Sequence, residues 1–118
     1  MDLGVVLTGR QKPATGAATK DALTILGGQV RTARTNQQWS RAQLAALAGC
    51  SPRTIASLET GSPTVSIGTA LEVMRALGIP LFGADDPVSL ARLKASTERY
   101  VAMLSARVHA KIKLDNDF

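Results

Sequence analysis

The feature that most constrains the fold is a pair of closely spaced helix start signals, at Ser40 and at Ser51. Ser40 is followed three residues later by Gln43, which gives the S-x-x-Q capping box that satisfies free backbone N–H groups at a helix start. Ser51 is followed by Pro52, an N-cap residue with proline at the first helical position. Gly49 stands between the two signals, where a left-handed residue ends a helix. The sequence therefore predicts two short helices joined by a turn of about three or four residues.

Apolar residues at three- and four-residue steps predict further helices on both sides of this pair. The stripes expected to face the core are Leu23, Leu26, Val30 and Ala33 before the pair, Leu44, Ala45, Leu47 and Ala48 in its first helix, Ile55 and Leu58 in its second, and Ile67, Ala70, Leu71, Met74 and Leu77 after it. A fifth helix is expected after Asp86-Pro87, with the apolar seam Leu90, Leu93, Tyr100, Val101, Leu104 and Val108. The fold class predicted is all-α, with five helices.

The end of the chain has a different pattern. Apolar and polar residues alternate from Val108 to Leu114, which is typical of a half-buried strand. The chain offers this segment no second strand, so we expect it to pair with another chain. Residues 1–20 are expected to form a flexible arm that carries Arg10, Lys12 and Lys20. The domain organisation predicted is an arm (1–20), a helical domain that contains the helix pair (21–82) and a C-terminal helix and tail (83–118).

The composition favours a polyanionic partner and gives no sign of catalysis. Fourteen Lys and Arg against nine Asp and Glu leave a net charge of +5. Aromatic residues make up only 3% of the chain, which disfavours recognition of single strands by base stacking. Cys50 and His109 each stand alone, so we expect no disulfide, no metal and no cofactor. We also expect no enzyme activity, no membrane segment and a cytoplasmic location.

The string from Ser40 to Gly61 resembles the xenobiotic-response-element (XRE) family of helix-turn-helix regulators, which includes phage Cro and repressor proteins. The residues at family positions are Leu44, Ala45, Ala48, Gly49, Ser51, Ile55, Leu58, Glu59 and Gly61. The resemblance covers roughly residues 23–79 and implies a lambda-repressor-like fold that binds duplex DNA. It also implies a structural ion pair between Arg34 and Glu59. Arg41 stands where the family often has a phosphate-binding glutamine.

The resemblance places base contacts on the first residues of the second helix of the pair. These are Ser51, Pro52, Arg53, Ala56 and Ser57. Arg53 is the principal candidate, because arginine can donate two hydrogen bonds to guanine O6 and N7. Thr60, Ser62 and Thr64 are candidate hydrogen-bond donors to DNA phosphates. Ser40 and Thr54 complete the set of expected DNA-contacting residues.

A narrower resemblance is to HipB-type antitoxins, the DNA-binding partners of HipA-like kinase toxins. It rests on Trp39, the pair Thr54-Ile55, and the ungapped run from Glu59 into the following helix. The C-terminal segment and Phe118 are the parts expected to engage such a toxin. Two readings of function follow: a homodimeric antitoxin that represses its own operon, and a free-standing repressor of the phage or restriction-control kind. A protein-interaction adaptor without DNA binding is a third reading.

Overall fold

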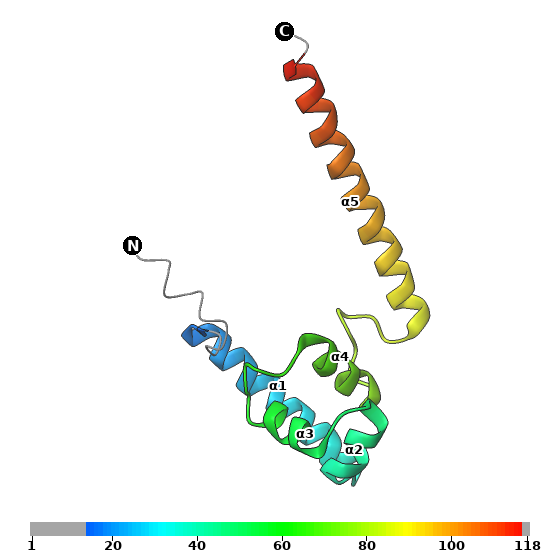
Figure 1. Ribbon diagram of the computed structural model, residues 1–118. Helices are drawn as coiled ribbons and strands as arrows, with labels where there is room; N and C mark the ends of the chain where they lie inside the picture. Colours follow the sequence, from blue (N-terminus) through cyan, green and yellow to red (C-terminus); the bar gives the residue numbers. More distant parts are fainter. Residues whose placement is uncertain (1–13, 117–118) are drawn as a thin grey trace. The chain divides into compact units, whose positions relative to one another are not determined.

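The computed structural model describes residues 14–116 and has five α-helices in that range (Figure 1). They are α1 (Ala17–Asn36), α2 (Arg41–Ala48), α3 (Pro52–Glu59), α4 (Ile67–Ala76) and α5 (Pro87–Asn116). The predicted all-α class is therefore confirmed. The chain divides into two compact units at the bond between Ile79 and Pro80, so that α1 to α4 form one unit and α5 belongs to the other.

The first unit is built around α3. This helix packs against both α1 and α2, and α2 packs in turn against α4 (Figure 1). All four helices contribute to one hydrophobic core, whose buried members are Val30, Leu44, Ala45, Ala48, Ile55, Leu58, Ala70, Val73 and Leu77. The inward residues of α3, Ile55 and Leu58, are at most 2% exposed. The core therefore fixes which side of α3 faces outward.

The helix start signals work as the sequence predicts. The Ser40 hydroxyl accepts from the backbone N–H of Gln43 at 3.1 Å, and the Gln43 side chain accepts from the backbone N–H of Ser40 at 2.7 Å. Gly49 ends α2 with a φ of 73°, a left-handed conformation that glycine adopts without steric cost. Ser51 then caps α3 by accepting from the N–H of Thr54 at 3.1 Å. The predicted helix–turn–helix connection is thus confirmed.

Gly27 lets α1 and α3 approach closely. It is buried, and a Cβ placed there would lie 2.6 Å from the backbone carbonyl oxygens of both Leu58 and Glu59. A side chain at this position would force the two helices apart. Gly27 therefore sets the distance at which α1 supports the end of α3.

Two core predictions are wrong in detail. Ile67, expected to face the core, is 78% exposed, while Val73 is fully buried. Ile67 is the first residue of α4, and one turn later the helix has turned Ala70 and Val73 inward instead. Leu47, also expected inward, is 54% exposed on the outer side of α2.

The first helix begins earlier than its apolar stripe. α1 starts at Ala17, so Lys20 lies in a helix and not in the predicted arm. The sequence pattern missed the first turn of α1, because the apolar spacing that marks an amphipathic helix is lacking at Thr15, Ala17, Ala18 and Thr19. Arg10, Lys12 and Phe118 lie outside the described residues.

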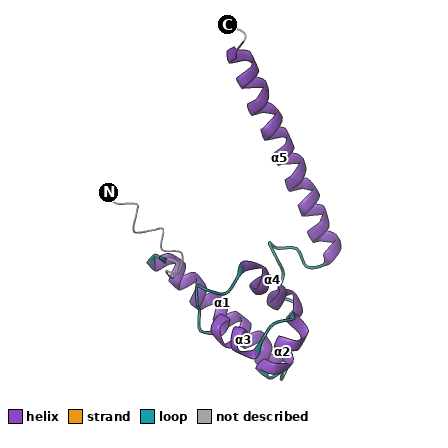
Figure 2. Ribbon diagram, in the orientation of Figure 1, coloured by secondary structure: helices purple, strands orange, loops and turns teal. Residues whose placement is uncertain are grey.

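The predicted strand from Val108 to Leu114 is wrong, because α5 continues as a helix to Asn116. Figure 2 shows only helices and loops in the described part of the chain. A helix satisfies its backbone hydrogen bonds within the segment, whereas a strand here would need a partner. Leu104, Val108 and Ile112 also follow a four-residue step, so the alternating pattern continues the helical seam. Within residues 14–116, no helix combines the length and apolar character needed to cross a bilayer.

Candidate nucleic-acid interface

The outward side of α3 borders an open, polar groove. Its lining residues come from α3, from the loop after it and from the start of α4: Ser51, Arg53, Thr54, Ser57, Thr64, Val65, Ser66 and Thr69. Seven of these eight side chains carry a hydroxyl or a guanidinium, so the groove offers hydrogen-bond donors along its length. It holds no acidic side chain. This chemistry suits a phosphate backbone and the base edges beside it.

Several hydroxyls in the groove already serve the fold. The Ser51 and Thr54 hydroxyls lie 2.9 Å apart, and Ser51 also caps α3. At the start of α4, the Ser66 hydroxyl donates to that of Thr69 at 2.8 Å. These side chains hold the two helix starts in place. Ser51, a predicted base reader, and Thr54, a predicted DNA-contacting residue, are therefore part of the cap that positions α3.

Arg53 is the side chain best placed to meet a ligand. It lies one residue after Pro52 in the first turn of α3 and is exposed. Its guanidinium forms no ion pair or hydrogen bond with any residue in the range 14–116. An exposed guanidinium without such a bond keeps its five donors available to a partner. Ala56 and Ser57, the other predicted readers, are half-buried on the next turn.

The three hydroxyls that were expected to bind phosphate lie at and after the end of α3, and among them Thr64 lines the groove, whereas Thr60 and Ser62 do not. The Thr60 hydroxyl donates to the backbone carbonyl of Ser57 at 2.9 Å. Ser62 and Thr64 have their hydroxyl oxygens 2.8 Å apart, and the Ser62 hydroxyl also accepts from the N–H of Thr64. Their role in binding phosphate stays a prediction.

A buried carboxylate fastens α3 to the two helices before it. Glu59, the last residue of α3, has a side chain only 1% exposed. Its Oε2 lies 2.6 Å from Nε of Arg34 on α1, and its Oε1 lies 3.1 Å from Nε of Arg41 on α2. Arg34 also donates to the backbone carbonyl of Trp39 at 2.8 Å. The Arg34–Glu59 pair implied by the family resemblance is thus confirmed.

The two arginines keep this carboxylate charged. Burial raises the pKa of Glu59, but hydrogen bonds and charge from Arg34 and Arg41 outweigh burial and leave the pKa below its ordinary value. The hydrogen bond to Glu59 raises the pKa of Arg34 in return. The triad of Arg34, Glu59 and Arg41 therefore stays ionised at neutral pH and fixes the end of α3 between α1 and α2.

Sequence reasoning missed the bond between Arg41 and Glu59. Arg41 was expected to hold a DNA phosphate, and its side chain is 44% exposed, so part of the guanidinium is open to solvent. The sequence did carry a signal, because Glu59 is the only acidic residue between Asp21 and Glu72. Any buried arginine in that stretch has a single carboxylate to pair with.

Comparison with known proteins supports the same interpretation. A family model described as a helix-turn-helix domain matches residues 25–85, which is more than half of the chain. The chain belongs to the helix-turn-helix family. The uncharacterized HTH-type transcriptional regulator y4mF of Sinorhizobium fredii is 42% identical over 53 residues, which cover 45% of this chain and 70% of that relative. These matches support a DNA-binding transcriptional regulator.

No solved structure matches this helix-turn-helix protein significantly. The narrower resemblances, to the XRE family and to HipB-type antitoxins, stay predictions, as do the DNA contacts of the individual residues.

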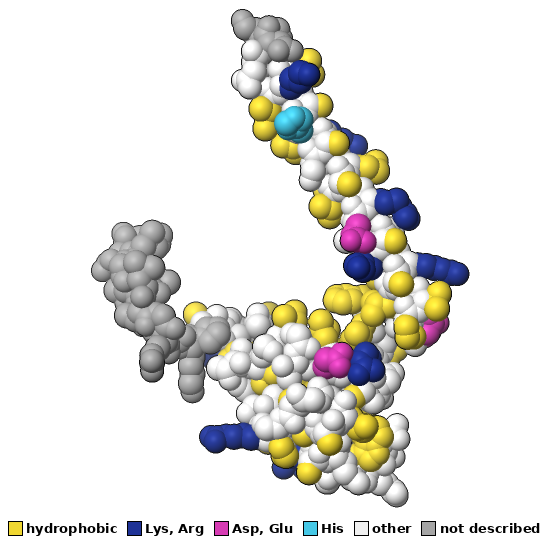
Figure 3. All heavy atoms as spheres, turned by 45° about the vertical axis from the view of Figure 1, so that its right-hand side comes forward, with side chains coloured by type: hydrophobic (Ala, Val, Ile, Leu, Met, Phe, Trp, Pro, Cys, Tyr) yellow, Lys and Arg dark blue, Asp and Glu magenta, His cyan; other side chains and the backbone are white. Residues whose placement is uncertain are grey.

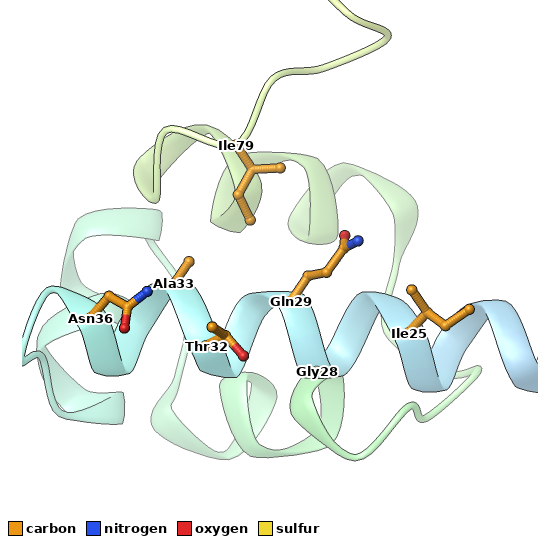
Figure 4. A pocket seen from close by; sticks show the side chains of 7 residues that line it. All are labelled: Ile25, Gly28, Gln29, Thr32, Ala33, Asn36 and Ile79. Carbon is orange, nitrogen blue, oxygen red and sulfur yellow. The ribbon is translucent and has the colours of Figure 1, made fainter.

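A second hollow on the first unit has little chemistry to offer. It lies along α1 beneath Ile79, and Figure 4 shows Ile25, Gln29, Thr32 and Asn36 projecting from α1 around it. Its lining contains no titratable side chain. Within residues 14–116, no three His, Cys, Asp or Glu side chains gather as they would around a metal ion. The groove beside α3 therefore remains the candidate site.

Proposed function

We propose that this helix-turn-helix protein is a sequence-specific transcriptional repressor that inserts α3 into the major groove of an operator. The single observation that carries the proposal is the state of Arg53, an exposed guanidinium without a partner among residues 14–116, at the start of a helix whose far end is fastened by Glu59. A major groove about 12 Å wide admits one α-helix. A helix held this firmly presents its first turn to base edges at small entropic cost.

The chemistry of the side chains determines which residues contact bases and which contact phosphates. Arg53 donates two hydrogen bonds to guanine O6 and N7, which discriminates that base by about 1–3 kcal/mol. Pro52 offers only an apolar ring to a thymine methyl. The hydroxyls of Thr60, Ser62 and Thr64, together with the open side of Arg41, bind phosphates and set the register of α3. Few bonds then read bases directly, and the shape of the DNA supplies the remaining specificity.

Replacing Arg53 by alanine tests the reading role. We expect affinity for a selected operator to fall about 10- to 100-fold, and the preference for guanine at one position of each half-site to disappear. Arg53→Lys keeps the charge but not the two-pronged geometry, so we expect it to restore non-specific binding and not base preference. Binding curves on matched operator duplexes measure both effects.

Arg31→Ala is the matched control. It removes the same charge from an exposed site on α1 that does not line the groove. We expect it to leave base preference unchanged. Unaltered operator affinity and specificity in Arg53→Ala would remove Arg53 as a reader and favour the adaptor reading of the chain.

Salt should weaken the complex strongly. Operator binding by two copies releases counterions from the phosphates that basic side chains such as Arg41 neutralise. With about four phosphates neutralised per dimer, raising salt from about 50 to about 200 mM should reduce affinity about 100-fold. Fluorescence anisotropy over a salt series gives the slope, and a slope near zero would contradict phosphate anchoring.

The finer proposal is that the protein acts as a cytoplasmic homodimer and as the HipB-like antitoxin of an operon that also encodes a HipA-like kinase toxin. It rests on the family resemblance of Trp39 and the Thr54-Ile55 pair. In the structure Trp39 lies beside the triad, because its backbone carbonyl accepts a hydrogen bond from Arg34. Co-expression with the neighbouring gene tests it: a kinase-like protein should co-purify with the chain. If no such protein co-purifies and the chain still binds its operator, the result would favour the alternative, a free-standing repressor. In neither reading does the protein catalyse a reaction.

A further inference from the structure

The long helix α5 carries an unburied apolar stripe. None of its 30 residues is buried. Stripe members Leu93, Val101, Leu104, Val108 and Ile112 are 40–58% exposed. Figure 3 shows hydrophobic side chains along much of this helix, between scattered basic ones. An isolated helix is marginal in water, and most helices are stabilised by packing an amphipathic face.

The stripe has a regular period. Its members follow one another at steps of three, four and four residues, twice over: Leu90, Leu93, Thr97, Val101, Leu104, Val108 and Ile112. This is an 11-residue repeat, and about 3.67 residues per turn keeps its members on one side of a nearly straight helix. The stripe therefore forms a continuous seam about 33 Å long, at 1.5 Å per residue.

We propose that this seam pairs with the same seam of a second copy of the chain, with the two α5 helices antiparallel and crossing at Val101. The spacing is nearly symmetric about that residue. In an antiparallel pair Leu90 lies opposite the second copy's Ile112, and Leu93 lies opposite its Val108. Thr97 then faces the second copy's Leu104, and each seam residue meets another seam residue within one position.

The helix dipoles favour the antiparallel orientation over the parallel one. Side-chain charge does not distinguish the two, because the first turns of α5 carry Arg92 and Lys94 and the last three carry Arg107, Lys111 and Lys113. A parallel pair would place like ends of the two helix dipoles together. The antiparallel pair sets the negative end of each helix dipole beside the positive end of the other.

The contact is large enough for specific association. Helices overlapping from Pro87 to Asp115 share about 42 Å of length and are about 10 Å across. The flat projection is then about 420 Å² on each copy, or about 840 Å² in total, and interlocking side chains enlarge it. The flat projection alone lies below the roughly 1,000 Å² that separates specific interfaces from incidental contacts, and the side chains that interlock across the seam supply the remaining area.

The antiparallel pair extends the proposed function by giving the regulator two copies. The role of the pair in DNA binding rests on the proposed function, but the pairing of the helices does not. A second copy supplies the second recognition helix that an operator with two half-sites requires. The residues between Leu77 and Pro87 link each first unit to its α5. Self-association itself can be measured without DNA.

The mass of the full chain in solution tests the seam. We expect a dimer of the 12.4 kDa chain at micromolar concentration by sedimentation equilibrium. Leu104→Glu places a charge in the middle of the seam and should weaken self-association at least about 100-fold. Ala106→Glu adds the same charge on the opposite side of the helix, and we expect the dimer to persist. A monomeric wild-type chain, or a Leu104→Glu variant as dimeric as the control, would overturn the proposal.

Disulfide cross-linking tests the orientation. In a Cys50→Ala background, copies carrying Leu90→Cys and copies carrying Ile112→Cys should cross-link when mixed, and neither should cross-link to itself. Efficient linkage of Leu90→Cys to its own kind would establish a parallel pair and overturn the antiparallel one. A dimer that forms as expected but binds no operator would refute the proposed function and leave this inference standing.

Discussion

Replacing Gly27 by alanine is expected to destabilise the first unit by about 3 kcal/mol. The added Cβ would lie 2.6 Å from the carbonyl oxygens of Leu58 and Glu59, both of which are backbone atoms that cannot rotate away. Helices α1 and α3 would have to separate, which opens the core around Val30 and Ile55. For a unit of this size the midpoint of thermal unfolding should fall by about 10–20 °C.

The neighbouring glycine supplies a control with the opposite sign. A Cβ at Gly28 would meet no atom within 4 Å, and the residue is an exposed interior position of α1. Gly28→Ala should therefore raise stability by about 0.5–1 kcal/mol through helix propensity alone. Urea unfolding of both variants measures the contrast. Equal effects of the two substitutions would show that α1 and α3 do not approach as closely as described.

Replacing Glu59 by glutamine is expected to reduce the free energy of unfolding by about 2–3 kcal/mol. The substitution keeps the shape and some hydrogen bonding but leaves the guanidinium of Arg34, 13% exposed, without its counter-charge. Glu72→Gln is the matched control, because its i,i+3 pair with Arg75 is more than half exposed on both sides and contributes little. A Glu59→Gln variant as stable as Glu72→Gln would refute the anchoring role.

The same triad predicts a dependence on pH with a definite sign. The pKa of Glu59 lies below its ordinary value in the folded protein, so its ion pairs stabilise the fold fully above pH 4.5. That stabilisation is lost as the pH falls below 4.5 and through the lowered pKa. We expect the stability difference between wild type and Glu59→Gln to shrink steadily over this interval. A difference that stays constant down to about pH 3 would contradict the ionised triad.

Local signals in the sequence sufficed where a short segment determines its own structure. The capping box of Ser40 and Gln43, the turn at Gly49 and the cap at Ser51 each depend on neighbours within four residues, and all three form as predicted. The Arg34–Glu59 pair was available only through family resemblance, since 25 positions separate its partners. The second bond, from Arg41, depends on how α2 and α3 meet and was not predicted.

The C-terminal segment shows the limit of periodicity. Val108, Ala110, Ile112 and Leu114 satisfy a two-residue period, and Val108 and Ile112 also satisfy a four-residue one. The helical period wins because the segment continues a helix already formed from Pro87 and needs no second strand. Ser51 and Thr54, both predicted to contact DNA, show a second limit, since a pattern of residue types does not reveal that their hydroxyls bind each other.

Methylation protection at guanine N7 tests the central claim most directly, because this atom lies in the major groove. Duplexes selected by the full-length protein from a random pool should show protected guanines in two clusters about one helical turn apart. Arg53→Ala should lose protection at one guanine in each cluster, and Arg31→Ala should not. Failure to select any sequence, or protection confined to the minor groove, would contradict the placement of α3 against the bases.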